Sequence, residues 1–95
     1  AWAGGEAGKS LDKADRLYAQ RSAQDTLENS GTGQTTSWRN PDSGNSGSYT
    51  PVRTYQTTGG ENCREYESTI VVDGREERAV GRACRQADGT WKIVP

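Results

Sequence analysis

One two-residue turn constrains the fold of this chain more than any other feature. Asp73 and Gly74 form an Asp-Gly pair, which favours a type I′ β-hairpin because both residues tolerate positive φ. Counting outward from that turn, one residue at a time on each side, brings Cys63 directly opposite Cys84. The turn and the cysteines therefore specify the same antiparallel register independently of each other.

That register predicts a cross-strand disulfide between Cys63 and Cys84. The two residues fall at a non-hydrogen-bonded pair, where opposed Cα atoms lie about 4.5 Å apart, within the range that a disulfide accepts. A bridge that closes a loop of roughly twenty residues contributes about 3 kcal/mol in the chain-entropy description, and it implies an oxidising compartment. The alternative is a pair of reduced, buried cysteines in a cytosolic protein.

The same register pairs further side chains across the hairpin. Glu65 faces Arg82, an ion pair that contributes little at a surface. Tyr66 faces Gly81, where the ring can cover bare backbone. The apolar residues that share the Tyr66 face are Ile70, Val72, Ala79 and Ala83.

A second Asp-Gly pair, Asp88 and Gly89, predicts another tight turn near the C-terminus. That turn would return Trp91 and Ile93 on the face of the sheet that carries Cys84. Because apolar groups then lie on both faces, the sequence does not decide which face a helix covers.

Few aliphatic residues are available to build a core around these hairpins. The chain has 95 residues, of which 29% are hydrophobic, against an ordinary share of about 45–50%. Large aromatic residues and two Cys supply buried groups and a crosslink, so we expect one small folded domain that depends on its disulfide. A formal net charge of -1 argues against an electrostatic nucleic-acid binder, and no apolar stretch is long enough to span a membrane.

Missing residue types exclude several chemistries. The chain has no His, which removes the commonest metal ligand and the usual general base for a Ser or Cys nucleophile. Two cysteines far apart in sequence cannot close a tetrahedral zinc site and do not form a Cys-x-x-Cys redox pair. The acidic residues leave glycoside hydrolysis by two carboxylates open, without a positive signal for it. We therefore expect no triad hydrolase, no metal and no cofactor.

The segment before the hairpins has helical periodicity over about residues 11–28. Ser10 is the predicted N-cap of this helix. Asn29, Ser30 and Gly31 are predicted to end it.

The predicted helix has two distinct faces. Apolar residues at helical spacing in its first turns are Leu11, Ala14, Leu17 and Tyr18. This stripe then drifts towards Ala23 and Leu27, so the C-terminal half is expected to pack more weakly. The charged residues that form a predicted solvated face are Asp12, Lys13, Asp15 and Arg16.

Beyond Gly33, short runs of Thr, Trp, Tyr and Val alternate with turn-forming clusters, which predicts β-strands. The predicted strands are 34–39, 48–56, 63–72, 75–85 and 90–94, with loops at 40–47 and 57–61. Pro51 marks an edge position or a bulge. Strands joined by short loops pair antiparallel, so the predicted fold class is α+β, with one N-terminal helix packed on an antiparallel meander sheet of about five strands.

Four segments of the chain together resemble a known family. They are GKSLDKADR at 8–16, WRNPDSGNSGSYTPVRTY at 38–55, CREY at 63–66 and GRACRQADGTWKIV at 81–94. In these segments the chain resembles the surface antigen domain at the C-terminus of small proteobacterial outer-membrane lipoproteins related to the rickettsial seventeen-kilodalton antigen. The resemblance covers nearly everything from residue 8 onward.

The resemblance implies a location and a domain organisation. Residues 1–9, with Gly4 and Gly8 at a Gly-x-x-x-Gly spacing, would be the end of a glycine-zipper segment, the alternative being a flexible tag. Residues 10–95 would be one surface antigen domain of the bacterial outer membrane, in the periplasm or exposed at the surface, without an enzymatic site. An envelope protein or peptidoglycan is the expected partner, and membrane contact would come only from an upstream lipid anchor or glycine-zipper segment.

Arginine and aromatic side chains form the candidate binding surface, because Arg pairs with carboxylates and stacks on rings. Residues of both kinds that lie close in sequence or predicted register are Trp38, Arg39, Arg53, Tyr55, Arg64, Arg85 and Trp91. They could bind a glycan strand, peptidoglycan carboxylates or a partner protein. The structural alternative, which we favour, is that their contacts hold together a domain with little aliphatic core.

The leading hypothesis for function is a non-enzymatic envelope domain with a structural or interaction role. One alternative is a periplasmic inhibitor that blocks a hydrolase with the loop 40–47, and another is a glycan- or peptidoglycan-binding module. The composition of that loop, NPDSGNSG, is also typical of an ordinary exposed turn, which is the interpretation we favour.

Overall fold

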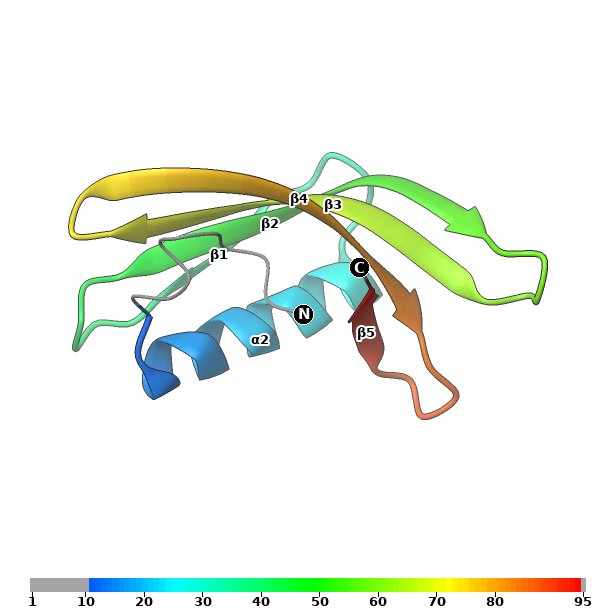
Figure 1. The fold of residues 1–95 in the computed structure, drawn as a ribbon, viewed down its shortest axis with the longest axis horizontal. Helices are drawn as coiled ribbons and strands as arrows, with labels where there is room; N and C mark the ends of the chain where they lie inside the picture. Colours follow the sequence, from blue (N-terminus) through cyan, green and yellow to red (C-terminus); the bar gives the residue numbers. More distant parts are fainter. Residues whose placement is uncertain (1–10, 95) are drawn as a thin grey trace.

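The structure, a computed structural model, describes residues 11–94 and confirms the predicted fold class (Figure 1). Helix α2 (Lys13–Asn29) lies against one side of a five-stranded antiparallel sheet. The strands are β1 (Thr36–Arg39), β2 (Ser46–Gln56), β3 (Asn62–Val72), β4 (Arg75–Arg85) and β5 (Trp91–Val94). Each strand pairs with the next in chain order, as expected for a meander. The predicted segment 1–9 lies outside the described residues.

The β3–β4 hairpin has the register that its turn predicts. Asp73 and Gly74 have φ angles of 52° and 76°, the two positive values of a type I′ turn. Cys63 lies opposite Cys84 with the two Cα atoms 4.0 Å apart, and a disulfide joins them. The predicted disulfide is thus confirmed.

The connection between β4 and β5 differs from the prediction by one residue. Its closing residues are Gln86 and Thr90, whose backbones are joined by a 2.7 Å hydrogen bond from N–H to carbonyl oxygen. Gly89 has a φ of 88°, as in a three-residue hairpin loop that ends in a left-handed glycine. The loop therefore has three residues instead of two.

Because of that extra residue, the predicted face of Trp91 and Ile93 was wrong. They pair with Arg85 and Ala83, so they lie on the Ala83 side of the sheet and not on the side of Cys84. Side chains alternate along a strand with a period of two, so one added loop residue moves every later side chain to the other face.

β2 contains a β-bulge half-way along its length. Pro51 pairs with Tyr66, whereas Arg53 pairs with Glu65, so Val52 is the additional residue. The sequence predicts an edge position or a bulge at Pro51, and the bulge is confirmed. Before Val52 the odd-numbered residues of β2 are buried on the helix side, and after it the odd-numbered residues lie on the outer side.

The N-terminus of α2 is capped by a different residue from the one predicted. Asp12, not Ser10, is the N-cap, and it forms a capping box with Asp15. In this arrangement Asp15 N–H donates to Asp12 Oδ1 at 2.7 Å, while the Asp12 N–H donates to the Asp15 carboxylate. The predicted end of the helix is confirmed, with the last helical residue at Asn29 and the C-cap at Ser30.

The predicted apolar face of the helix is buried only in part: Leu11, Ala23 and Leu27 are buried as predicted, but the other members are not. Leu17 and Tyr18 are 47% and 40% exposed, and Ala14 is exposed as well. The buried residues of the helix are Asp15, Ala19, Ser22, Ala23, Thr26 and Leu27. Half of these are polar, so a stripe drawn through apolar residues alone misses part of the face. Most of them lie in the C-terminal half, which was expected to pack more weakly.

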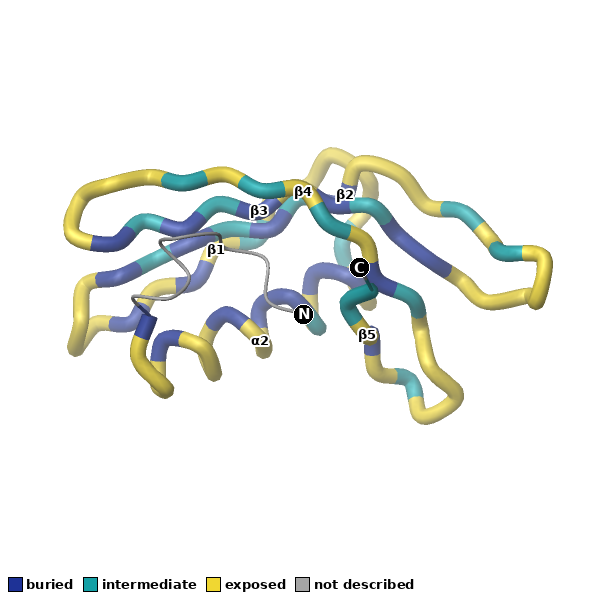
Figure 2. Tube along the Cα trace, viewed as in Figure 1, coloured by how far each residue is buried: buried dark blue, intermediate teal, exposed yellow. Residues whose placement is uncertain are grey.

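The core lies between α2 and the face of the sheet that carries Tyr66, so the helix covers that face (Figure 2). Its members are Leu11, Ala19, Ala23, Leu27, Trp38, Tyr49, Tyr66, Ile70, Val72, Ala83 and Trp91. Tyr49 and Tyr66 meet edge to face with ring centroids 5.8 Å apart. Aromatic rings thus supply much of the buried volume that the scarce aliphatic residues do not.

Two glycines allow these rings to lie close to the backbone. Tyr66 lies across Gly81, as predicted, and a Cβ at Gly81 would be 2.6 Å from the Tyr66 Oη. Trp38 covers Gly47 of β2 in the same way, and a Cβ there would also collide with the carbonyl oxygen of Thr69. Any larger residue at either position would displace a core ring.

Within residues 11–94, no helix has both the length and the apolar character needed to cross a membrane.

Candidate functional site

A buried carboxylate organises the N-terminal end of α2. Asp15 is 0% exposed, and its Oδ1 accepts hydrogen bonds from Asn40 Nδ2 at 2.8 Å and Ser43 Oγ at 2.6 Å. Its Oδ2 accepts hydrogen bonds from Asn45 Nδ2 at 2.8 Å and from the Asp12 N–H at 3.1 Å. We call these five residues the Asp15 cluster. The cluster ties the start of the helix to the loop between β1 and β2.

The hydrogen bonds of the cluster keep Asp15 ionised. Burial alone would raise the pKa of Asp15, but the bonds from Ser43, Asn45, the Asp12 backbone and Asn40 together lower it below the usual value of 3.8. The negative charge also lies in the first helical turn, where the helix dipole favours an anion. The predicted solvated face was therefore wrong for Asp15, which is a buried structural anion.

The loop 40–47 is anchored to the helix and is not simply an exposed turn. Asn40 and Asn45 are 1% and 8% exposed because their amides reach into the Asp15 cluster. Pro41 and Asp42 at the tip of the loop remain exposed. The loop thus combines a fixed base with a solvent-facing tip.

A buried cation holds the opposite end of the helix. Arg64 of β3 donates hydrogen bonds from Nη1 to the carbonyl oxygens of Leu27 at 2.9 Å and Ser30 at 2.7 Å. Its Nε donates to Thr54 Oγ1 at 2.9 Å. The last turn of α2 contains no basic residue, so Arg64 supplies from the sheet the positive charge that suits a helix C-terminus. We call this arrangement the Arg64 clamp.

Two side chains of α2 attach the edge strand β5. The Gln24 amide accepts a hydrogen bond from the Trp91 N–H at 2.8 Å and donates one to the Trp91 carbonyl oxygen at 2.6 Å. Glu28 accepts hydrogen bonds from Arg85 Nε at 2.8 Å and Trp91 Nε1 at 3.3 Å, and these two bonds lower the pKa of Glu28. Gln24 therefore occupies backbone groups that would otherwise be available to another strand.

Four residues of the candidate binding surface lie on the helix side of the sheet. Trp38, Arg64 and Trp91 are buried there, with 6%, 8% and 8% of their surface exposed. Arg85 lies on the same side and pairs with Glu28. In these positions they make contacts within the domain, as expected if their role is to hold together a fold with little aliphatic core.

The other three candidate residues lie on the outer side of the sheet. Arg39 is exposed near the end of β1. Arg53 lies over the ring of Tyr55, with its Cζ 4.8 Å from the ring centroid, and its Nη1 is 3.9 Å from Glu65 Oε1. The structure therefore divides the seven candidates between two faces, and it brings Arg53 and Tyr55 together.

Strand register adds further charged residues beside Arg53. Arg53, Glu65 and Arg82 lie side by side on β2, β3 and β4, which confirms the predicted Glu65–Arg82 pairing. Lys92 lies in the next row, across the disulfide from Tyr55. We call these five residues the outer patch. The predicted surface does not include Arg82 and Lys92, because their positions beside Arg53 and Tyr55 depend on the Val52 bulge and the three-residue β4–β5 loop.

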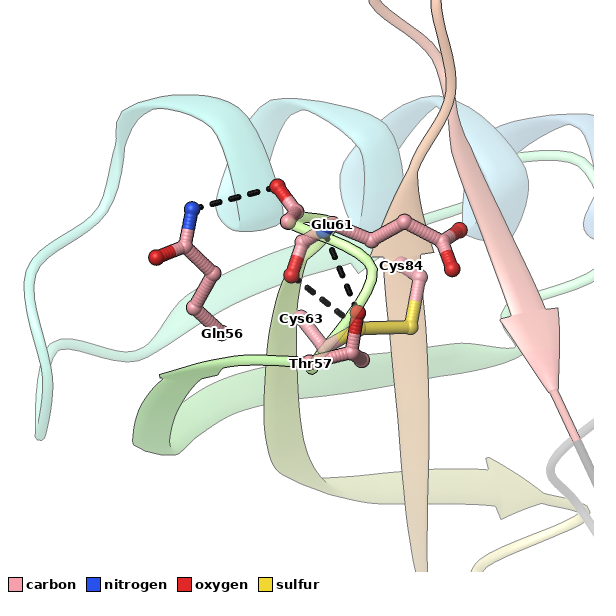
Figure 3. The surroundings of a disulfide bond; sticks show 6 residues. Gln56, Thr57, Glu61, Cys63 and Cys84 are labelled. Carbon is pink, nitrogen blue, oxygen red and sulfur yellow. Dashed lines mark hydrogen bonds between the residues drawn. A yellow bond between two sulfur atoms is a disulfide. The ribbon is translucent and has the colours of Figure 1, made fainter.

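The disulfide lies beside the turn that joins β2 to β3 (Figure 3). Thr57 N–H donates to the Glu61 carbonyl oxygen at 2.9 Å, and Glu61 N–H donates to Thr57 Oγ1 at 3.1 Å. Cys63 is 0% exposed, whereas Cys84 is partly exposed. The two cysteine residues thus differ in their exposure to solvent.

The described part of the chain contains few groups suited to catalysis. Within residues 11–94, no three His, Cys, Asp or Glu side chains lie close enough together to hold a metal ion. Burial raises the pKa of Tyr49 and Tyr66, so both phenols stay protonated. A hollow of about 430 Å³ on β3 and β4 is lined by Glu67, Ser68, Thr69, Arg78, Ala79 and Val80. It contains one carboxylate, so it lacks the pair that glycoside hydrolysis needs.

Comparison with known proteins gives a consistent result. A family model described as 17 kDa outer membrane surface antigen matches residues 25–92. The 17 kDa surface antigen of Rickettsia conorii is 45% identical over 84 residues, which cover 88% of this chain and 53% of that protein. The protein of the same name from Rickettsia bellii is 45% identical over 87 residues, covering 92% and 55%. The one from Rickettsia prowazekii is 43% identical over 83 residues, covering 87% and 52%.

The chain spans about half the length of the curated relatives it matches. No solved structure matches it.

Proposed function

Because this chain belongs to the 17 kDa outer membrane surface antigen family, we propose that it is a non-enzymatic cell-envelope domain with an interaction role. It acts at the outer membrane, on the periplasmic side or at the cell surface. The disulfide supports this location, since such bonds persist in oxidising compartments.

The division between the two faces of the sheet carries the proposal. On the helix side, the charged and aromatic groups are used in contacts within the domain, namely the Asp15 cluster, the Arg64 clamp and the attachment of β5. On the outer side, the outer patch presents three cations and one anion to solvent, and the side chains of Arg53 and Glu65 are 61% and 42% exposed. A rigid sheet that presents such a surface suits binding to an acidic envelope component.

The test is crosslinking in intact cells followed by mass spectrometry of the captured partners. The outer patch is altered by Arg53→Ser with Lys92→Ser, and the matched control is Lys13→Ser with Arg21→Ser, two exposed cations of α2. We expect crosslinks to peptidoglycan fragments or outer-membrane proteins that the outer-patch variant loses and the control keeps. Crosslinks that survive both variants equally would overturn the outer patch as the binding surface.

A second candidate function, inhibition of a periplasmic hydrolase, is favoured by one observation. The loop 40–47 has a base fixed by Asn40 and Asn45 and an exposed tip at Pro41 and Asp42, and such pre-organisation suits an inhibitory loop. The same crosslinking experiment separates the two functions. A stoichiometric hydrolase captured through the loop tip would favour inhibition over binding through the outer patch.

A further inference from the structure

The disulfide occupies the point where two hairpins separate. Cys63 and Cys84 form the last pair of the β3–β4 ladder, which runs without a break back to the turn at Asp73 and Gly74. Beyond that pair, the β2–β3 hairpin continues in one direction and the β4–β5 hairpin turns down beside α2 (Figure 1). The covalent bond therefore joins the two hairpins at the base of a fork.

Besides its pairing with β4 and the packing of Trp91 in the core, the β4–β5 hairpin is held to α2 by few side-chain hydrogen bonds. β5 is a four-residue edge strand, and side-chain hydrogen bonds from the helix reach it from Gln24 and Glu28. The ion pair between Arg85 and Glu28 is exposed, with side chains 43% and 36% accessible, so it contributes little by itself. The Arg64 clamp, in contrast, belongs to β3 and does not depend on β5.

We propose that the disulfide is a reducible latch for the β4–β5 hairpin. When a dithiol reductant opens it, the hairpin leaves α2 and exposes Trp91, while the Asp15 cluster, the Arg64 clamp and the rest of the β3–β4 ladder stay folded. Trp91 is 8% exposed in the closed form, and Ile93 and Ala83 lie beside it on the same face. Opening therefore uncovers apolar residues that the core buries in the closed form.

The unequal exposure of the two cysteine residues sets the order of the reaction. A thiolate of the reductant attacks the Sγ of Cys84, the more exposed of the two residues, which forms a mixed disulfide and releases Cys63 as a thiolate that takes up a proton. The second thiol of the reductant then attacks its own sulfur in the mixed disulfide and releases Cys84. The protein disulfide gains two electrons and the dithiol is oxidised to its own disulfide.

Hydrogen exchange measured residue by residue by NMR, before and after dithiothreitol, tests the latch. We expect the exchange of the Trp91 N–H, which is bonded to Gln24, to rise by about tenfold or more, and the side-chain amides of Asn40 and Asn45 to change by less than about twofold. Thiol titration of the same sample establishes that both cysteines are reduced.

A variant with an intact disulfide provides the matched comparison. Gln24→Ala removes the acceptor of the Trp91 main-chain N–H without opening the fork, so we expect it to raise exchange at that N–H alone. Reduction should also raise exchange at the Trp91 indole N–H, which is bonded to Glu28. Three results would overturn the latch: no change at Trp91 after complete reduction, an equal rise throughout the sheet, or a disulfide that dithiothreitol cannot reduce while the protein is folded.

Discussion

The two ends of helix α2 are fixed by opposite chemistry. At the N-terminal end a buried anion, Asp15, accepts hydrogen bonds from one loop. At the C-terminal end a buried cation, Arg64, donates hydrogen bonds to main-chain carbonyl groups. Each charge has the sign that complements the helix dipole at its end. A domain with few aliphatic residues thus fixes its helix at both ends instead of relying on a continuous apolar stripe.

The ends also differ in what supports them. The residue before Arg64 is Cys63, so a covalent bond to β4 adjoins the cation. The Asp15 carboxylate depends on side-chain donors from a loop and on the Asp12 backbone. Loss of the central charge should therefore cost more at the N-terminal end than at the C-terminal end.

The largest effect is expected for Asp15→Ala, which leaves the buried donors of Asn40, Ser43 and Asn45 without their acceptor. We expect the free energy of unfolding to fall by about 3–5 kcal/mol, measured by urea denaturation followed by circular dichroism. The control is Asp25→Ala, an exposed carboxylate on the same helix, which should change stability by less than about 0.5 kcal/mol. Similar losses in the two variants would contradict a special role for the Asp15 cluster.

A smaller loss of stability is expected for Arg64→Met, which keeps the apolar part of the side chain and removes the guanidinium. The carbonyl groups of Leu27 and Ser30 lose a charged donor, so unfolding should require about 2–3 kcal/mol less free energy. Arg53→Met in the outer patch is the matched control and should cost less than about 0.5 kcal/mol, because Arg53 is exposed. If Arg53→Met lowered the free energy of unfolding as much as Arg64→Met, the buried contacts of Arg64 with the helix would not explain its loss of stability.

Acid should weaken the N-terminal end of the helix. The pKa of Asp15 is lower in the folded protein than its usual 3.8, so its contribution to stability is complete above that value and is lost as the pH falls through the folded pKa. Urea midpoints at about pH 6 and pH 3 should therefore differ for the wild type, and by less for Asp15→Asn. Glu28, whose pKa is also lowered, adds to the acid loss, so Glu28→Gln measures its separate share. An Asp15→Asn variant with the full wild-type acid loss would argue against this assignment.

The smallest effect is expected for Gln24→Ala, which removes two hydrogen bonds to the Trp91 backbone. A loss of about 1 kcal/mol is expected because solvent can replace both partners at this partly buried site. Gln20→Ala, at an exposed position one turn earlier, should be neutral. Equal behaviour of the two glutamines in thermal unfolding would show that β5 does not depend on Gln24.

The part of the fold that could be predicted from sequence is the part where two independent signals agree. The type I′ turn at Asp73 and Gly74 fixes a loop length, and the cysteines require the same pairing. At Asp88 and Gly89 the same dipeptide lies within a three-residue loop. No cysteine pair or other second signal is present there to argue against the predicted two-residue turn. The Asp-Gly dipeptide alone was therefore enough to predict the β4–β5 hairpin but not to fix its register.

The helix face and the site were harder to predict, because polar residues take part in burial. Asp15 and Thr26 are 0% exposed, and Thr26 bonds its hydroxyl to the carbonyl oxygen of Ser22 at 2.6 Å. A pattern of apolar residues cannot include such positions. The partners of Asp15 lie 25 to 30 residues away in a loop, and no local periodicity connects them to the helix.

The bulge at Val52 determines where β2 can lose a residue without turning its side chains to the wrong face. Deleting Val52 would restore regular alternation and keep Arg53 facing outward opposite Glu65, so we expect this deletion to be tolerated. Deleting Thr54 instead would turn Tyr55 over towards the helix and remove the acceptor of the Arg64 Nε. Natural deletions of a single codon in this strand should therefore be kept at Val52 and eliminated two positions later.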